Sequence, residues 1–187
     1  VSAPTTYFRL WTIGLESGLP EPLPIPRAFT GVYSPDGSRI AHEEFSTAFI
    51  PAWYEASYWK NYRGGRTHPI RVMTLSDHSI EKLPWDNSND TNPMWIGNTI
   101  YFLSDRNGLV NLYSYRTDTK QVAQITRHED FDVMNAAAGA DAIVYEQAGY
   151  VHLLDPRSGQ SRRLNIEVNG DLPWARPGAP RPGLLQR

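Results

Sequence analysis

The 187-residue sequence predicts an all-β chain that forms a partial β-propeller of about three and a half four-stranded antiparallel blades. Apolar anchor residues recur at a constant spacing in four successive stretches. Between them, short runs rich in β-branched and aromatic residues alternate with Gly, Pro, Asn and Asp turns, and the unit repeats about every 40 residues. Helical periodicity is not sustained, and only residues 46–62 could hold a short helix.

The anchors come in four pairs whose members lie 13 residues apart, with a polar turn between them. Turns of this kind supply positive φ or local side-chain hydrogen bonds and suit a hairpin. The pairs are Leu10 and Leu23, Ile70 and Leu83, Leu112 and Ile125, and Val151 and Leu164. A third anchor follows a Gly-containing turn at Ile40, Ile100 and Ile143. Each unit is therefore expected to hold four strands, which in the second unit lie near 92–96, 99–104, 111–116 and 121–126.

In chain order, the pattern predicts an incomplete β-propeller over residues 1–168, followed by a Pro-rich linker or tail at 169–187. The propeller part begins with a half blade at 8–23, and blades follow at about 28–85, 92–127 and 131–168. The first full blade carries an aromatic insertion at 46–66. In the third, residues 135–139 (Asn-Ala-Ala-Ala-Gly) are interpreted as a diverged form of the Ser-Pro-Asp-Gly turn at 34–37.

The blade count indicates an unfinished ring, because propellers close with about four to eight blades. An open ring leaves sheet edges with unpaired backbone groups. We therefore expect the chain to be part of a longer protein, with self-association of two copies as the other way to complete the ring.

The composition of the chain excludes several classes of site and binding partner. The chain has no Cys, which excludes disulfides, thiolate metal sites and a cysteine nucleophile. Its net charge of −2 offers no basic face for nucleic acid, and no apolar run is long enough to span a membrane. No signal peptide is visible at Val1, although a cleaved precursor or an excised fragment would look the same. A cytoplasmic location is expected, with periplasmic or secreted as the alternative.

Metal and cofactor sites are not predicted. The five histidines show no ligand spacing and are expected to be solvated or satisfied in the core: His42, His68, His78, His128 and His152. Four aspartates are expected in polar loops without the spacing of a calcium loop: Asp86, Asp90, Asp130 and Asp132.

A catalytic site is not expected either. Ser34 precedes a Pro-Asp-Gly turn, where its hydroxyl should bond the local backbone, and no Gly-x-Ser-x-Gly elbow occurs. Gly64 and Gly65 lack the Lys and Ser or Thr of a phosphate loop and are expected to permit a tight turn.

The insertion is the strongest candidate for recognition. Five aromatic residues fall within positions 53–62, and aromatics beside Arg make good anchors because they bury large areas at low entropic cost. The candidate substrate- or partner-binding residues are Trp53, Tyr54, Tyr58, Trp59, Tyr62, Arg63 and Arg66. The alternative is that these side chains pack on the blade.

Several segments resemble known propeller repeats. Residues 34–41 (Ser-Pro-Asp-Gly-Ser-Arg-Ile-Ala) resemble the turn and strand of the TolB and tricorn protease repeats. Residues 59–70, with Tyr-Arg-Gly-Gly at 62–65, are more specific and resemble the N-terminal propeller of tricorn-like serine proteases. Residues 104–113 and the Gly-Asp-Leu-Pro segment at 170–173 fit the same pattern, so the resemblance covers about 8–177.

The resemblance implies a serine peptidase in which propellers precede a PDZ-like domain and a separate catalytic domain. No segment of this chain matches the catalytic parts. The expected function is a non-catalytic propeller segment that contributes peptide-substrate gating or subunit contacts. Expected partners are peptides or proteins, the remaining blades and catalytic domain of a longer chain, or a second copy. The alternative is a TolB-like protein–protein interaction module with no peptidase attached.

Overall fold

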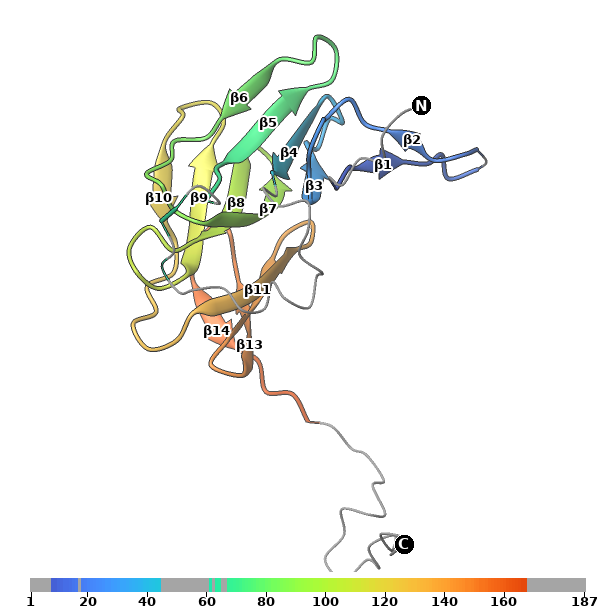
Figure 1. The fold of residues 1–187 in the computed structure, drawn as a ribbon. Helices are drawn as coiled ribbons and strands as arrows, with labels where there is room; N and C mark the ends of the chain where they lie inside the picture. The colour runs from blue at the N-terminus through green and yellow to red at the C-terminus, as the bar shows by residue number, and fades with distance from the viewer. Residues whose placement is uncertain (1–7, 17, 45–60, 62, 65–66, 168–187) are drawn as a thin grey trace, which may run out of the picture.

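The computed structural model describes residues 8–16, 18–44, 61, 63–64 and 67–167, and in these ranges the chain is all-β. Fourteen strands form three four-stranded antiparallel sheets and one two-stranded sheet (Figure 1). This arrangement confirms a partial propeller of three blades and a half blade. Most of the predicted insertion, the short helix expected within it and the predicted tail lie outside the described residues. No helix in the described part of the chain has the length and apolar character needed to cross a membrane.

The half blade is a hairpin, and each full blade is a four-stranded meander in chain order. The half blade contains β1 (Trp11–Thr12) and β2 (Glu21–Pro22). The first full blade contains β3 (Thr30–Tyr33), β4 (Arg39–Glu43), β5 (Ile70–Thr74) and β6 (Ile80–Lys82). The second contains β7 (Asp90–Ile96), β8 (Thr99–Ser104), β9 (Asn111–Arg116) and β10 (Val122–Gln124). The third contains β11 (Val133–Ala138), β12 (Ile143–Gln147), β13 (Tyr150–Leu154) and β14 (Ser161–Arg163).

One backbone hydrogen bond explains the 13-residue spacing. In every unit the N–H of the second anchor donates to the carbonyl oxygen of the first, next to the pairing of the last two strands. The four bonds are Leu23 to Leu10 at 2.9 Å, Leu83 to Ile70 at 3.0 Å, Ile125 to Leu112 at 2.8 Å and Leu164 to Val151 at 2.8 Å. The spacing in the sequence therefore records the length of one closed hairpin, repeated four times.

The core lies between successive sheets because alternate side chains of a strand point to opposite faces. In β8, Ile100 and Phe102 pack against the first blade, whereas Tyr101 and Leu103 pack toward the third. Phe102 is fully buried. The second blade is thus covered on both faces, and its two central strands, β8 and β9, are near-continuous runs of buried residues.

Asp90 departs from the prediction of a polar loop, because it lies in β7 and is fully buried. The hydroxyls of Ser88 and Ser104 donate to Oδ1 at 2.7 and 2.6 Å, and the Arg106 guanidinium binds Oδ2 at 2.9 Å. These three donors replace the water that a loop aspartate would bind. Burial raises the pKa of Asp90, and the Arg106 charge and the two serine hydroxyls oppose that rise.

Candidate functional site

The first strands of the three full blades form an inner wall, defined here as β3, β7 and β11. β7 contacts both β3 and β11, so segments distant in sequence lie side by side (Figure 1). In a propeller such strands face the central channel. The only charged residue in these three strands is Asp90, which is buried, so the wall presents backbone and uncharged side chains.

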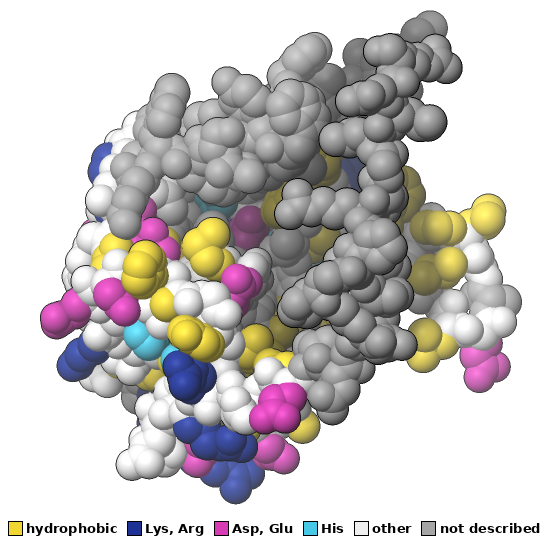
Figure 2. Space-filling view, turned by 90° about the horizontal axis from the view of Figure 1, so that it is seen from below, with side chains coloured by type: hydrophobic (Ala, Val, Ile, Leu, Met, Phe, Trp, Pro, Cys, Tyr) yellow, Lys and Arg dark blue, Asp and Glu magenta, His cyan; other side chains and the backbone are white. Residues whose placement is uncertain are grey.

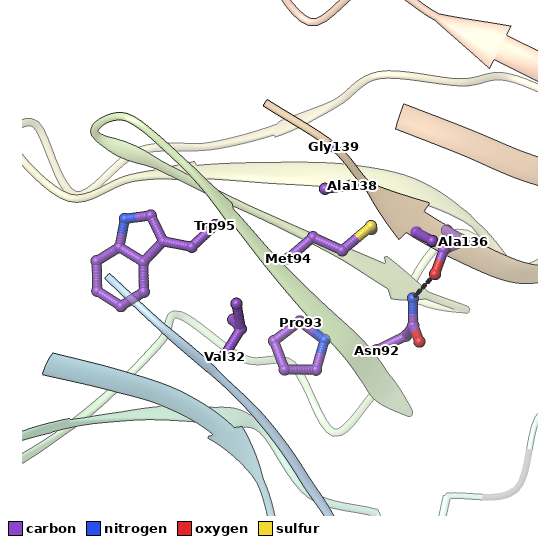
Figure 3. Close-up of a pocket in the computed structure, with 9 residues that line it drawn as sticks. Val32, Asn92, Pro93, Met94, Trp95, Ala136, Ala138 and Gly139 are labelled. Atoms are coloured by element: carbon purple, nitrogen blue, oxygen red, sulfur yellow. Dashed lines mark hydrogen bonds between the residues drawn. The ribbon is translucent and has the colours of Figure 1, made fainter. Parts of the chain in front are cut away.

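A cavity of about 280 Å³ opens on this wall. It lies near the lower end of the roughly 300–1,000 Å³ that ligand pockets span. Figure 3 shows Val32, Pro93 and Trp95 around one part of it and Asn92 reaching across to Ala136. Met94 from β7, and Ala137, Ala138 and Gly139 from β11 and the turn after it, also line the cavity. All three blades therefore contribute to one small, uncharged hollow.

Asn92 links the three blades at the edge of this cavity. The β7–β8 register shifts between Thr91 and Met94, and Asn92 has a left-handed φ of 56° at that bulge. Its N–H donates to Glu43 Oε2 at 2.7 Å, and its side-chain amide donates to the Ala136 carbonyl oxygen at 2.6 Å. A bulge re-aims a side chain and is common beside binding sites. Here it directs one carboxamide from the second blade onto the backbone of the third.

Trp95 closes the cavity on the side of the first blade. The ring is almost fully buried, its Nε1–H donates to the Gly97 carbonyl oxygen at 3.0 Å, and the Arg39 guanidinium lies 5.0 Å from the ring centroid. These contacts hold the indole in one orientation. It serves as a rigid wall of the cavity.

Of the seven predicted binding residues, only Arg63 lies in the described part of the chain. Its guanidinium binds Asp105 Oδ2 at 2.7 Å and donates to the Asp105 carbonyl oxygen at 2.9 Å. The Asn87 amide donates to the Arg63 carbonyl oxygen at 2.9 Å. Arg63 therefore fastens the end of the predicted insertion to the second blade. Trp53, Tyr54, Tyr58, Trp59, Tyr62 and Arg66 lie outside the described residues, so their predicted role stays a prediction.

The histidines divide into two environments. His42 is buried at 1% exposure in β4, and neither ring nitrogen has a hydrogen-bond partner, contrary to the expectation of a satisfied core histidine. Burial lowers its pKa to about 4. His128 instead contacts the third blade, with Nε2 3.1 Å from the Tyr145 hydroxyl. The Tyr145 ring stacks on the His152 ring, with 4.9 Å between the ring centroids.

Two of the predictions about reactive side chains concern the described residues, which are 8–16, 18–44, 61, 63–64 and 67–167. In those ranges there is no group of three or more His, Cys, Asp or Glu side chains placed to hold a metal ion. The Ser34 hydroxyl accepts the Arg39 N–H at 2.9 Å, which confirms the local turn role predicted for it.

Sequence reasoning missed the inner-wall residues. Residues 135–138 were expected in a turn but belong to β11, because pairing with β12 outweighs the weak strand preference of alanine. The available signals were an Asn-Pro pair inside a predicted strand, which indicates a bulge, and a run of small residues where backbones approach closely.

Comparisons with known proteins agree on one family. A family model described as the tricorn protease N-terminal beta propeller domain matches residues 1–160. A tricorn protease homolog of Saccharolobus solfataricus is 31% identical over 113 residues, covering 60% of this chain and 11% of the relative. Tricorn protease homolog 1 of Streptomyces coelicolor is 32% identical over 145 residues, covering 76% of this chain and 14% of the relative. The chain thus spans only a small part of the length of these relatives.

Solved structures show the same fold. The crystal structure of the tricorn protease matches with a TM-score of 0.68 at 20% identity, over 89% of this chain and 16% of that one. TolB from Acinetobacter baumannii matches with a TM-score of 0.62 at 20% identity, over 87% of this chain and 39% of that one. At these identities the likeness supports the propeller architecture alone.

Proposed function

Because the chain belongs to the tricorn protease N-terminal β-propeller family, we propose that it is a non-catalytic part of a longer serine peptidase and that its inner wall contacts peptide segments. The wall would control which segments pass along the channel, which is a gating role. Cleavage would take place elsewhere in the longer protein.

The observation that carries this proposal is the uncharged inner wall with its cavity of about 280 Å³. Peptides of different sequence share only their backbone, so a surface that passes many of them should avoid strong charge preferences. Backbone groups and small side chains meet that requirement. A polyanion would need a basic groove, and on the face shown in Figure 2 basic and acidic side chains are interspersed.

A matched pair of substitutions tests the proposal. Ala137 on the inner wall and Ala123 on the outer strand β10 are both exposed alanines in strands. Ala137→Trp places a large ring on the strand that lines the cavity and should weaken binding of a fluorescein-labelled, uncharged decapeptide by about tenfold, equivalent to about 1.4 kcal/mol. Ala123→Trp should leave affinity within about twofold, well below that difference.

Fluorescence anisotropy with the 187-residue chain is the measurement. Equal affinities for Ala137→Trp and the unmodified chain would show that peptides do not use the inner wall. Loss of binding in Ala123→Trp alone would place the contact on the outer face and favour a docking module of another kind.

A further inference from the structure

Strand β11 carries backbone groups that face away from its own sheet. It is the end strand of the third blade, and within the part of the chain that the structure describes it pairs only with β12. Gly139 N–H donates to the Ala142 carbonyl oxygen at 2.8 Å, so by alternation Ala137 and Asn135 bond β12. The N–H and C=O of Ala136 and Ala138 must therefore point outward, toward the cavity that both residues line.

The Asn92 side chain bonds one of these outward groups. Its amide donates to the Ala136 carbonyl oxygen at 2.6 Å, the contact that a neighbouring strand's N–H would make (Figure 3). Across the described ranges, this is the single hydrogen bond to the outward backbone groups of Ala136 and Ala138. A carboxamide and a backbone amide are chemically the same donor. Asn92 thus stands where a backbone N–H of an added strand would lie.

We propose that β11 accepts an extended, uncharged peptide segment as an additional strand and that Asn92 is a displaceable gate at its first hydrogen-bonding position. This rests on the proposed function and specifies its binding mode. The segment would pair with Ala136 and Ala138 through its backbone and place alternate side chains in the cavity beside Val32 and Pro93. Displacement of the Asn92 amide exchanges one hydrogen bond for an equivalent one.

The residues that line the cavity determine which kind of peptide can bind there. Among the described residues, the cavity lining contains no Lys, Arg, Asp or Glu, so a charged side chain entering it would lose its water without gaining a partner there. Its alanines and glycine leave room for a backbone to approach at strand spacing, about 4.8 Å. A peptide with small or apolar side chains satisfies both conditions.

The gate can be removed without straining the backbone. Asn92→Gly keeps the left-handed φ of 56°, which glycine adopts readily, and keeps the N–H that bonds Glu43. Only the amide on the Ala136 carbonyl is lost. The expected result is an increase of about fivefold in affinity for the uncharged decapeptide, because the peptide no longer competes with Asn92.

Asn87→Gly is the matched control. Asn87 precedes β7 and also has a left-handed φ, 64°. Its amide also donates to a backbone carbonyl, that of Arg63 at 2.9 Å, and its Oδ1 accepts from the Thr67 hydroxyl at 2.6 Å. The affinity of the Asn87→Gly variant for the decapeptide should stay unchanged. An equal rise in both variants would indicate general loosening and overturn the gate, as would unchanged or weaker binding in a natively folded Asn92→Gly.

A second probe keeps the inference testable if Asn92→Gly does not fold. A decapeptide N-methylated at alternate residues has the same side chains but cannot donate along one edge, so its binding should fall by about tenfold or more. If both peptides bind equally and Ala137→Trp blocks both, strand addition is wrong while wall contact stands. If the unmodified chain binds neither peptide, the proposed function itself fails.

Discussion

Replacement of Asp90 by alanine is expected to lower the free energy of unfolding by about 3–5 kcal/mol, the usual cost of breaking a buried ion pair by removing one partner. Asp90 is fully buried in β7 and accepts from Ser88, Ser104 and Arg106. Without the carboxylate, two hydroxyls and a guanidinium that is only 12% exposed lose their acceptor. Urea unfolding followed by tryptophan fluorescence measures the change.

The control for Asp90→Ala is Asp118→Ala. Asp118 forms an ion pair with Arg116 at 2.7 Å, but both side chains are well exposed at 42% and 58%. Exposed ion pairs add little to folding stability because water and salt screen them, so this variant should unfold nearly as the unmodified chain does. Similar losses in the two variants would show that the buried network does not hold the second blade together.

The loss of folding stability at acidic pH is expected to depend on His42. Its pKa is about 4 in the folded chain, against 6.5 for the unperturbed side chain, because burial disfavours the charged ring. Between these pH values the unfolded chain binds the proton and the folded chain does not, so stability is full above about pH 6.5 and falls as the pH drops toward 4. The total loss is about 3 kcal/mol, of which about 2 kcal/mol appears between pH 7 and pH 5.

The measurement is urea unfolding of the unmodified chain and His42→Leu at pH 7 and pH 5. Leucine cannot titrate, so the variant should lose about 2 kcal/mol less than the unmodified chain over that interval. His78→Asn, at an exposed turn position with φ of 58°, should retain the original pH dependence. Identical pH dependence in His42→Leu and the unmodified chain would contradict the assignment.

The repeat architecture could be predicted from the sequence because the signals that define it are local. Leu112 and Ile125 are apolar anchors at positions set by hairpin length, and their 13-residue spacing recurs in four units. Strand β8 was expected at 99–104 and lies there.

The structure of the inner wall could not be predicted from the sequence, because it depends on contacts between different blades. The bulge at Asn92 is stabilised by Glu43 from the first blade and Ala136 from the third. Likewise, the buried Asp90 at the start of β7 is bonded by Ser104 at the end of β8 and by Arg106 just after it. Such contacts leave no periodic pattern in the sequence.

The hairpin that keeps a length of 13 residues in every unit also determines where the chain can change length. The connections between the second and third strands of the blades differ greatly, running from Glu43 to Ile70, from Ser104 to Asn111 and from Gln147 to Tyr150. Length variation on that side leaves the closing hydrogen bonds untouched. Each blade thus combines a hairpin of constant length with a connection whose length can vary, so a longer loop can be inserted there without changing the strand pairing of the blade.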